Sequence, residues 1–228
     1  MLKASIAPHE VEKLSACGWT EAYFPSSSDL LAFAAALGTP HPSRLGGPLI
    51  DKLVPTDGRH ARDGTMSASL GFEKFPLHTD GAYFRTPPRF IILRLASGAQ
   101  SARATLVCDV ASLALTAEER HVLAREVWIV RGGGRSFLSS ILNDSLFHAR
   151  TVVRYDQFCM TPAGPRSPRS ASILDSALEK ATPVRVHWDC NKLLVLDNWR
   201  VLHGRGEGPL DRNEGRILER VSVLSEGA

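Results

Sequence analysis

The stretch Phe75-Pro-Leu-His78-Thr-Asp80-Gly-Ala-Tyr-Phe84 holds the pattern on which the fold and the chemistry of this chain depend. His78 and Asp80 are two residues apart, and on a strand the side chains at i and i+2 point to the same face. An imidazole nitrogen and a carboxylate oxygen are then expected side by side in one cavity. They supply two of the three ligands of a facial triad, which suits non-haem Fe(II) and leaves coordination positions open.

The third ligand is expected on a distant, neighbouring strand. His203 is the obvious candidate, because the apolar run 193–196 leads into Asp197-Asn-Trp-Arg-Val-Leu-His203-Gly-Arg. We interpret Asp197 and Asn198 as residues that shape the turn before His203 rather than as metal ligands. Taken alone, His-x-Asp is a weak signal, since a solvated pair of polar residues produces the same pattern.

The bulk properties describe an ordinary globular chain of 228 residues, with 43% apolar and 22% charged residues. The net charge of +3 comes from scattered arginines, which argues against nucleic acid or a membrane as partner. The N-terminus has no apolar core of a signal peptide, so we expect a soluble cytoplasmic protein. We expect four reduced and at least partly buried cysteines, whose wide spacing excludes a zinc knuckle or a disulfide scaffold: Cys17, Cys108, Cys159 and Cys190.

Short apolar runs with few helices predict a β-barrel or sandwich flanked by N-terminal helices. We expect one domain over residues 1–228, with a β-rich core over about 66–224 and helices and loops in 1–65. Helices are predicted at 8–17, 30–37, 116–124 and 170–180. Strands are predicted at 19–24, 90–95, 105–110, 127–130, 151–155, 184–188, 192–196 and 216–224. The strands 184–188 and 192–196 are expected to pair as a hairpin.

Two loops rich in Pro, Gly and Arg, 39–65 and 161–169, are candidates for a wall or lid over a site, or for mobile segments. The glycine run 132–134, flanked by arginines, could suggest a phosphate site, but it lacks the Walker and Rossmann spacings, so we interpret it as a plain turn or a mobile loop. Arg216 and Arg220 lie four residues apart on the last predicted strand, so both face one side. A core strand seldom turns two arginines inward unless they meet anions.

These motifs together resemble the TauD/TfdA family, the taurine dioxygenase-like and clavaminate synthase-like Fe(II)/2-oxoglutarate-dependent dioxygenases. The resemblance spans roughly residues 66–224 and rests on motifs in a fixed order: His78-Thr-Asp80, Thr105, Asp197 to Arg205, and Arg216-Ile-Leu-Glu-Arg220. It implies a mainly β fold with flanking helices and a double-stranded β-helix core, also called a jelly roll or cupin-like fold.

The resemblance also implies roles for individual residues. His78, Asp80 and His203 would bind iron. Arg216 and Thr105 would bind the C5 carboxylate of 2-oxoglutarate, and Arg220 would face its C1 end or an anionic group of the substrate. The wide gap after His203 leaves Arg212 as an alternative anchor, but we prefer Arg216, because Arg212 belongs to the loop 208–215.

The activity implied is hydroxylation of a small anionic or amino-acid-like metabolite with Fe(II), 2-oxoglutarate and O2, releasing succinate and CO2. Related halogenases have a small residue in place of Asp80, so this carboxylate argues against halogenation.

Tyr83, Phe84 and Trp199 are candidates to line the pocket, with core packing as their alternative, and Arg154 is expected on the surface. A homo-oligomer is compatible with the sequence. The competing functions are a non-catalytic jelly-roll binding protein and a hydrolase that uses the same ligands with zinc or manganese.

Overall fold

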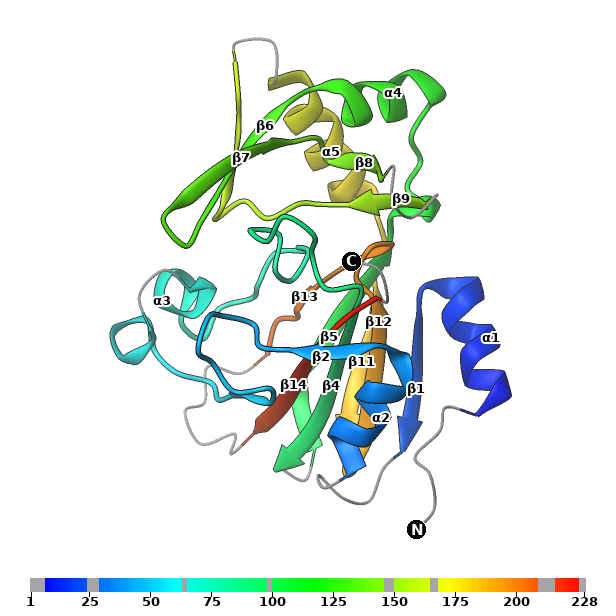
Figure 1. Ribbon diagram of the computed structural model, residues 1–228, viewed down its shortest axis with the longest axis vertical. Helices are drawn as coiled ribbons and strands as arrows, with labels where there is room; N and C mark the ends of the chain where they lie inside the picture. Colours follow the sequence, from blue (N-terminus) through cyan, green and yellow to red (C-terminus); the bar gives the residue numbers. More distant parts are fainter. Residues whose placement is uncertain are drawn as a thin grey trace.

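The computed structural model describes residues 7–23, 29–62, 65–97, 100–145, 150–164, 168–208 and 216–225 (Figure 1). Its centre consists of two sheets of antiparallel strands. The larger sheet has the order β1-β12-β4-β14-β2, with β3 also paired to β14; its members are β1 Trp19–Tyr23, β2 Thr39–His41, β3 Asp51–Leu53, β4 Phe90–Ser97, β12 Lys192–Asp197 and β14 Ile217–Leu224. The smaller sheet has the order β11-β5-β13, with β11 Val184–Asp189, β5 Gln100–Asp109 and β13 Val201–Arg205.

The two sheets enclose an apolar core to which both contribute alternate residues. From the larger sheet come Ile91 and Leu93 on β4 and Leu194 on β12, and from the smaller sheet come Val107 and Trp188. Side chains one position along each strand point to the opposite face. This two-layer arrangement is the sandwich that the short apolar runs predicted.

The other face of the larger sheet is covered by helices α1 (Pro8–Cys17) and α2 (Leu30–Leu37), as Figure 1 shows. Phe33 and Ala34 of α2 are fully buried and pack with Ile92 and Leu193 in a second cluster. The helix predicted at 30–37 is therefore confirmed, and it packs against the larger sheet.

A third cluster lies in the upper part of Figure 1, under α4 (Ala117–Arg125) and α5 (Pro168–Lys180). Thr116 and Glu119 form a capping box at the start of α4. Five strands complete this region, in the sheets β10-β6-β7 and β8-β9: β6 Trp128–Gly132, β7 Arg135–Ser139, β8 Leu142–Ser145, β9 Arg150–Val153 and β10 Met160–Pro162. The turn predicted at 132–134 joins β6 to β7, with Gly133 and Gly134 at positive φ.

Two local predictions were wrong. The chain from Met66 was expected to be β, but α3 (Met66–Leu70) is a short helix whose N-cap Thr65 accepts a hydrogen bond from the amide of Ala68. The predicted hairpin was also wrong, because β11 pairs with β5 in the smaller sheet while β12 pairs with β1 and β4 in the larger one. The turn through Asn191, which has φ 63°, carries the chain from one sheet to the other.

The two loops that were candidates for a wall or lid differ in structure. Segment 39–65 contributes β2 and β3, which both pair with β14, and a short 3-10 helix at Gly58–His60. In segment 161–169, residues 161–162 end β10 and residue 168 begins α5, while 165–167 lie outside the described residues.

None of the four cysteines forms a disulfide, as expected, but Cys17 and Cys190 are exposed rather than partly buried. No helix in the described part of the chain has the length and hydropathy needed to cross a membrane.

Candidate metal centre

His78 and His203 are brought together by the backbone. The amide of each residue donates a hydrogen bond to the carbonyl of the other, at 2.9 and 3.0 Å, and the two residues form an isolated antiparallel bridge. Directly opposed residues present their side chains on the same face. The two rings accordingly lie 4.7 Å apart between centroids. Gly204 allows this approach, because a Cβ there would lie 2.5 Å from the carbonyl oxygen of Phe75.

Asp80 lies in a turn rather than on the strand that the sequence suggested, and Asn198 fixes its position. The side-chain oxygen of Asn198 accepts from the Asp80 amide at 3.0 Å, and its Nδ2 donates to the Asp80 carbonyl at 2.9 Å. The same Nδ2 donates to Pro88, and the side chain is fully buried. Asn198 therefore does more than shape the turn before His203, a role that the sequence did not reveal.

The ligand atoms of the three residues converge within 4.8 Å of one another. Nε2 of His78 lies 3.4 Å from Oδ1 of Asp80, and Nε2 of His203 lies 3.7 Å from Oδ2. Two atoms bound to one metal at about 2.1 Å, and at right angles to each other, are about 3 Å apart. The two histidines and the carboxylate therefore fit a facial-triad metal.

The hydrogen bond of His78 supports the same orientation. Its Nδ1 lies 2.9 Å from the carbonyl oxygen of Pro76, which selects the tautomer with the proton on Nδ1. In the neutral ring Nε2 then carries the lone pair and is the atom available to a metal. Metal-binding histidines are commonly oriented in this way by a backbone carbonyl.

The three side chains of the triad influence one another electrostatically. Burial opposes ionisation of Asp80, but the charge of Arg220 and the hydrogen bonds of both histidines hold its pKa well below the usual value. Burial lowers the pKa of His203. For His78 the effect of burial is outweighed by the hydrogen bond and charge of Asp80, so its pKa is raised.

Arg220, on the inward face of β14, connects the triad to segment 39–65. Its Nη1 donates to Oδ2 of Asp80 at 2.9 Å, and its Nη2 donates to Oδ2 of Asp51 at 3.0 Å. Arg44 donates to the other oxygen of Asp51 at 2.9 Å. The sequence placed Arg220 in the site, but it gave no signal for Asp51.

Thr105 and Arg216 meet at Trp188. The indole nitrogen of Trp188 donates to the Thr105 hydroxyl at 3.0 Å, and the guanidinium of Arg216 lies 6.0 Å from the Trp188 ring. Arg216 also donates to the carbonyl of Arg103 at 3.3 Å, and all three clustered side chains are buried. Arg212, the alternative anchor, lies outside the described residues.

Tyr83 and Phe84 join the loop after Asp80 to segment 39–65. The Tyr83 hydroxyl donates to the carbonyl of Ser43, and the Phe84 ring makes an edge contact with His41 at 5.5 Å. Segment 39–65 therefore borders the site, as the wall interpretation required.

Arg154 was expected on the surface, and this was wrong. It is 3% exposed and donates to the carbonyls of Ala82, Phe84 and Arg85. Burial lowers its pKa to about 10. A guanidinium can be buried when its N–H groups find acceptors, and here the backbone of the loop after Asp80 provides them.

Comparison with protein families gives a match to the family model described as Taurine catabolism dioxygenase TauD, TfdA family, over residues 21–222. The chain belongs to this family. The resemblance inferred from the sequence motifs is thereby confirmed, and with it the class of iron- and 2-oxoglutarate-dependent dioxygenases. A search among curated protein sequences finds no match.

Solved structures show that the TauD/TfdA chain has the fold of known oxygenases. An asparagine oxygenase in complex with Fe(II), (2S,3S)-3-hydroxyasparagine and succinate matches with a TM-score of 0.76 and 17% identity, covering 95% of this chain and 78% of that one. The non-haem iron oxygenase OrfP, in complex with Fe and α-ketoglutaric acid, matches with a TM-score of 0.74 and 19% identity, covering 96% and 78%. At these identities the likeness establishes the expected jelly-roll fold.

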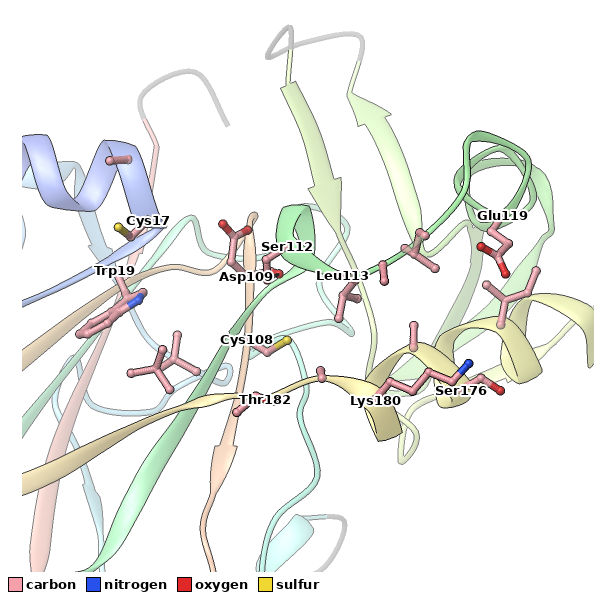
Figure 2. Close-up of a pocket in the computed structure, with 18 residues that line it drawn as sticks. Cys17, Trp19, Cys108, Asp109, Ser112, Leu113, Glu119, Ser176, Lys180 and Thr182 are labelled. Atoms are coloured by element: carbon pink, nitrogen blue, oxygen red, sulfur yellow. Dashed lines mark hydrogen bonds between the residues drawn. The ribbon is translucent and has the colours of Figure 1, made fainter.

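Two cavities of this dioxygenase have no triad residue in their walls. One, of about 480 Å³, lies between α1, the end of β5 and α5; Figure 2 shows Trp19, Cys108 and Lys180 at its wall. Burial raises the pKa of the Cys108 thiol, which makes it a poor nucleophile. The other, of about 720 Å³, includes Trp199, whose indole donates to the carbonyl of Pro87 at 2.8 Å.

Proposed function

We propose that this dioxygenase hydroxylates an unactivated C–H bond of a small, amino-acid-like or anionic metabolite and releases succinate and CO2. The observation that carries the proposal is the convergence of two imidazole nitrogens and one carboxylate within 4.8 Å, in a chain that belongs to the TauD/TfdA family. That donor set suits non-haem Fe(II) and leaves coordination positions open.

His78, Asp80 and His203 would hold the metal. Iron, when bound with 2-oxoglutarate and O2, supplies the oxidising chemistry, while the protein orients the reactants and excludes water. Both histidines are less than 8% exposed, which suits that task. The carboxylate of Asp80 supports hydroxylation over halogenation, since it takes the position at which a halide would bind.

Arg216, Thr105 and Trp188 form the proposed anchor for the C5 carboxylate of 2-oxoglutarate. A hydroxyl has one donor and two acceptor positions. Because the Thr105 oxygen accepts from Trp188, its own proton remains able to donate to a carboxylate. A guanidinium beside it adds the charge that fixes such an anion. Trp188 thus joins Thr105 and Arg216 as a residue that positions the co-substrate.

An amino-acid-like substrate is supported by the structural neighbours, one with 3-hydroxyasparagine and one, OrfP, with (3S)-hydroxy-L-Arg. We place this substrate between the triad, segment 39–65 and the Tyr83–Phe84 loop. Arg220 is our candidate to face the C1 end of 2-oxoglutarate or the substrate. Trp199 has the least support as a pocket residue, since its indole is already bonded to Pro87. We further propose a cytoplasmic location.

The test is anaerobic addition of Fe(II) and 2-oxoglutarate, with the visible charge-transfer band of the chelate as readout. The band should be lost in His78→Ala and should need far more 2-oxoglutarate in Arg216→Ala. Free asparagine and arginine are then screened by succinate release. Iron-loaded, folded protein without the band would refute the proposal and favour the hydrolase, while a band without succinate for any substrate would favour the binding protein.

A further inference from the structure

Arg220 has two carboxylate partners that come from different parts of the chain. Asp51 on β3 is its direct cross-strand partner, since the Cα atoms of the two residues are paired in the register of β3 and β14. Asp80 belongs to the triad. One guanidinium therefore bridges a residue of the outer segment 39–65 and a metal-ligand candidate, at 3.0 and 2.9 Å.

The bridge determines which way the Asp80 carboxylate faces. Arg220 donates to Oδ2, the oxygen that lies 3.7 Å from His203, while Oδ1 lies 3.4 Å from His78. A carboxylate oxygen has two lone pairs, so Oδ2 can accept from Arg220 and still face a metal. Hydrogen bonds of this kind to a ligating carboxylate orient it for the metal.

The position of Arg220 also carries an electrostatic cost, because a guanidinium so close to the triad repels a divalent cation. Asp51 compensates that charge. It is 6% exposed and is held in turn by Arg44, so that charges alternate along the row Asp80, Arg220, Asp51 and Arg44. Ser43 and the two arginines outweigh the effect of burial and lower the pKa of Asp51.

We propose that Asp51 is a positioning residue of the metal centre, which acts through Arg220 to orient Asp80 and to offset the guanidinium charge near the metal. The inference deepens the proposed function and rests on a metal being bound by the triad. It also assigns a role to segment 39–65, which supplies the Asp51 carboxylate that pairs with Arg220. No sequence motif marks this role.

A second buried ion pair on β14 provides the matched control. Glu219, next to Arg220 in sequence, accepts from Arg94 at 2.7 Å on the opposite face of the sheet. Side-chain exposures are 8% for Arg94 and 10% for Glu219, similar to the 8% of Asp51. Substitution of either acid disturbs a buried pair of the same sheet, but only Asp51 is linked to the triad.

The test measures Mn(II) affinity by EPR titration of the full chain, with Mn(II) as a redox-stable probe for the site. Asp51→Asn should bind Mn(II) at least about tenfold more weakly than wild type, as expected for a residue behind a ligand. Asp51→Glu, which keeps the charge, should recover much of the affinity. Glu219→Gln should bind within about twofold of wild type, although its thermal unfolding temperature falls.

Three results would overturn the inference: wild-type affinity in folded Asp51→Asn, an equal loss in Asp51→Glu and Asp51→Asn, or an equal loss in Glu219→Gln. Unfolding curves with and without Mn(II) show whether Asp51→Asn is folded. If it is not, the Mn(II) affinity of Asp51→Glu, compared with that of wild type, decides whether a carboxylate at position 51 supports the metal centre. Wild-type protein that fails to bind Mn(II) would instead contradict the proposed metal centre itself, and the inference with it.

Discussion

Arg220 and Glu219 are neighbours on β14, and each forms a buried ion pair, but the two pairs have different consequences. Glu219 meets one partner, Arg94, at 2.7 Å on the face covered by the N-terminal helices. Arg220 meets two carboxylates on the inward face, and one of them belongs to the triad. The Arg94–Glu219 pair contacts no triad residue in the ion pairs of the described residues, whereas Arg220 connects Asp80 of the triad to Asp51 and, through it, to Arg44 in segment 39–65.

The largest difference between the two ion pairs should appear in Mn(II) affinity, when the Asp80 carboxylate is removed. Asp80→Ala should lower Mn(II) binding below detection, because one of the three proposed ligand groups is lost. Asp51 cannot replace it, since Arg220 lies between Asp51 and the triad. Isothermal titration measures this. The metal-free variant should nevertheless lose little stability, since Arg220 keeps Asp51 as a partner. A loss of stability as large as that of Glu219→Gln would mean that the two pairs are equivalent.

Glu219→Gln should show the opposite combination. Removal of one partner of a buried ion pair leaves an uncompensated charge and costs about 3 kcal/mol of unfolding free energy. Urea unfolding at neutral pH measures the change, and Mn(II) affinity should stay at the wild-type value. The double variant Arg94→Met/Glu219→Leu should recover most of the stability, because apolar side chains can replace such a pair. Failure of the double variant to recover would show that the outer pair has a further role.

The inward and outward residues also differ in how far the sequence revealed them. The order of the motifs marked His78, Asp80 and His203, which the structure brings within 4.8 Å of one another, while the role of Arg216 stays a prediction. Asp51 was not found, since its importance comes from its register with β14, and no short-range pattern encodes the pairing of strands so distant in sequence. Arg154 was misjudged for the same reason, because its acceptors are backbone carbonyls about seventy positions away.

The fold was predicted in outline, and its one topological error is instructive. The hairpin prediction for 184–196 rested on the short turn at 189–191, but a short turn only requires that the chain reverse direction. Every residue of β12 is buried, and a strand buried on both faces belongs in the middle of a sheet. The unbroken apolar run 193–196 was therefore the signal that this strand pairs with two others rather than with its neighbour in sequence.

A smaller effect on Mn(II) affinity is expected from Asn198, which holds the backbone of Asp80. Asn198→Ala removes three hydrogen bonds, two of them to the backbone of Asp80. Mn(II) affinity should fall about tenfold, the lower end of the range for residues that orient a ligand. Arg89→Met is the matched control, because Arg89 pairs with Asp197 in the same turn at 3.5 Å and does not contact Asp80. Equal losses in both variants would show that the turn as a whole, and not Asn198, positions Asp80.

The smallest effect on stability and on Mn(II) affinity should come from Arg44, the last residue in the row of charges that starts at Asp80. The side chain of Arg44 is 43% exposed, and exposed ion pairs contribute about 0–1 kcal/mol because water screens them. Arg44→Ala should therefore change the unfolding free energy by less than about 1 kcal/mol and the Mn(II) affinity by less than about threefold. Asp51 keeps Arg220 as partner in this variant, so the compensation of charge at the centre persists. The difference between wild type and Arg44→Ala should shrink further in 1 M salt, where the Debye length is about 3 Å. An effect on Mn(II) affinity as large as that of Asp51→Asn would mean that Arg44, and not the buried pair, controls the position of Asp51.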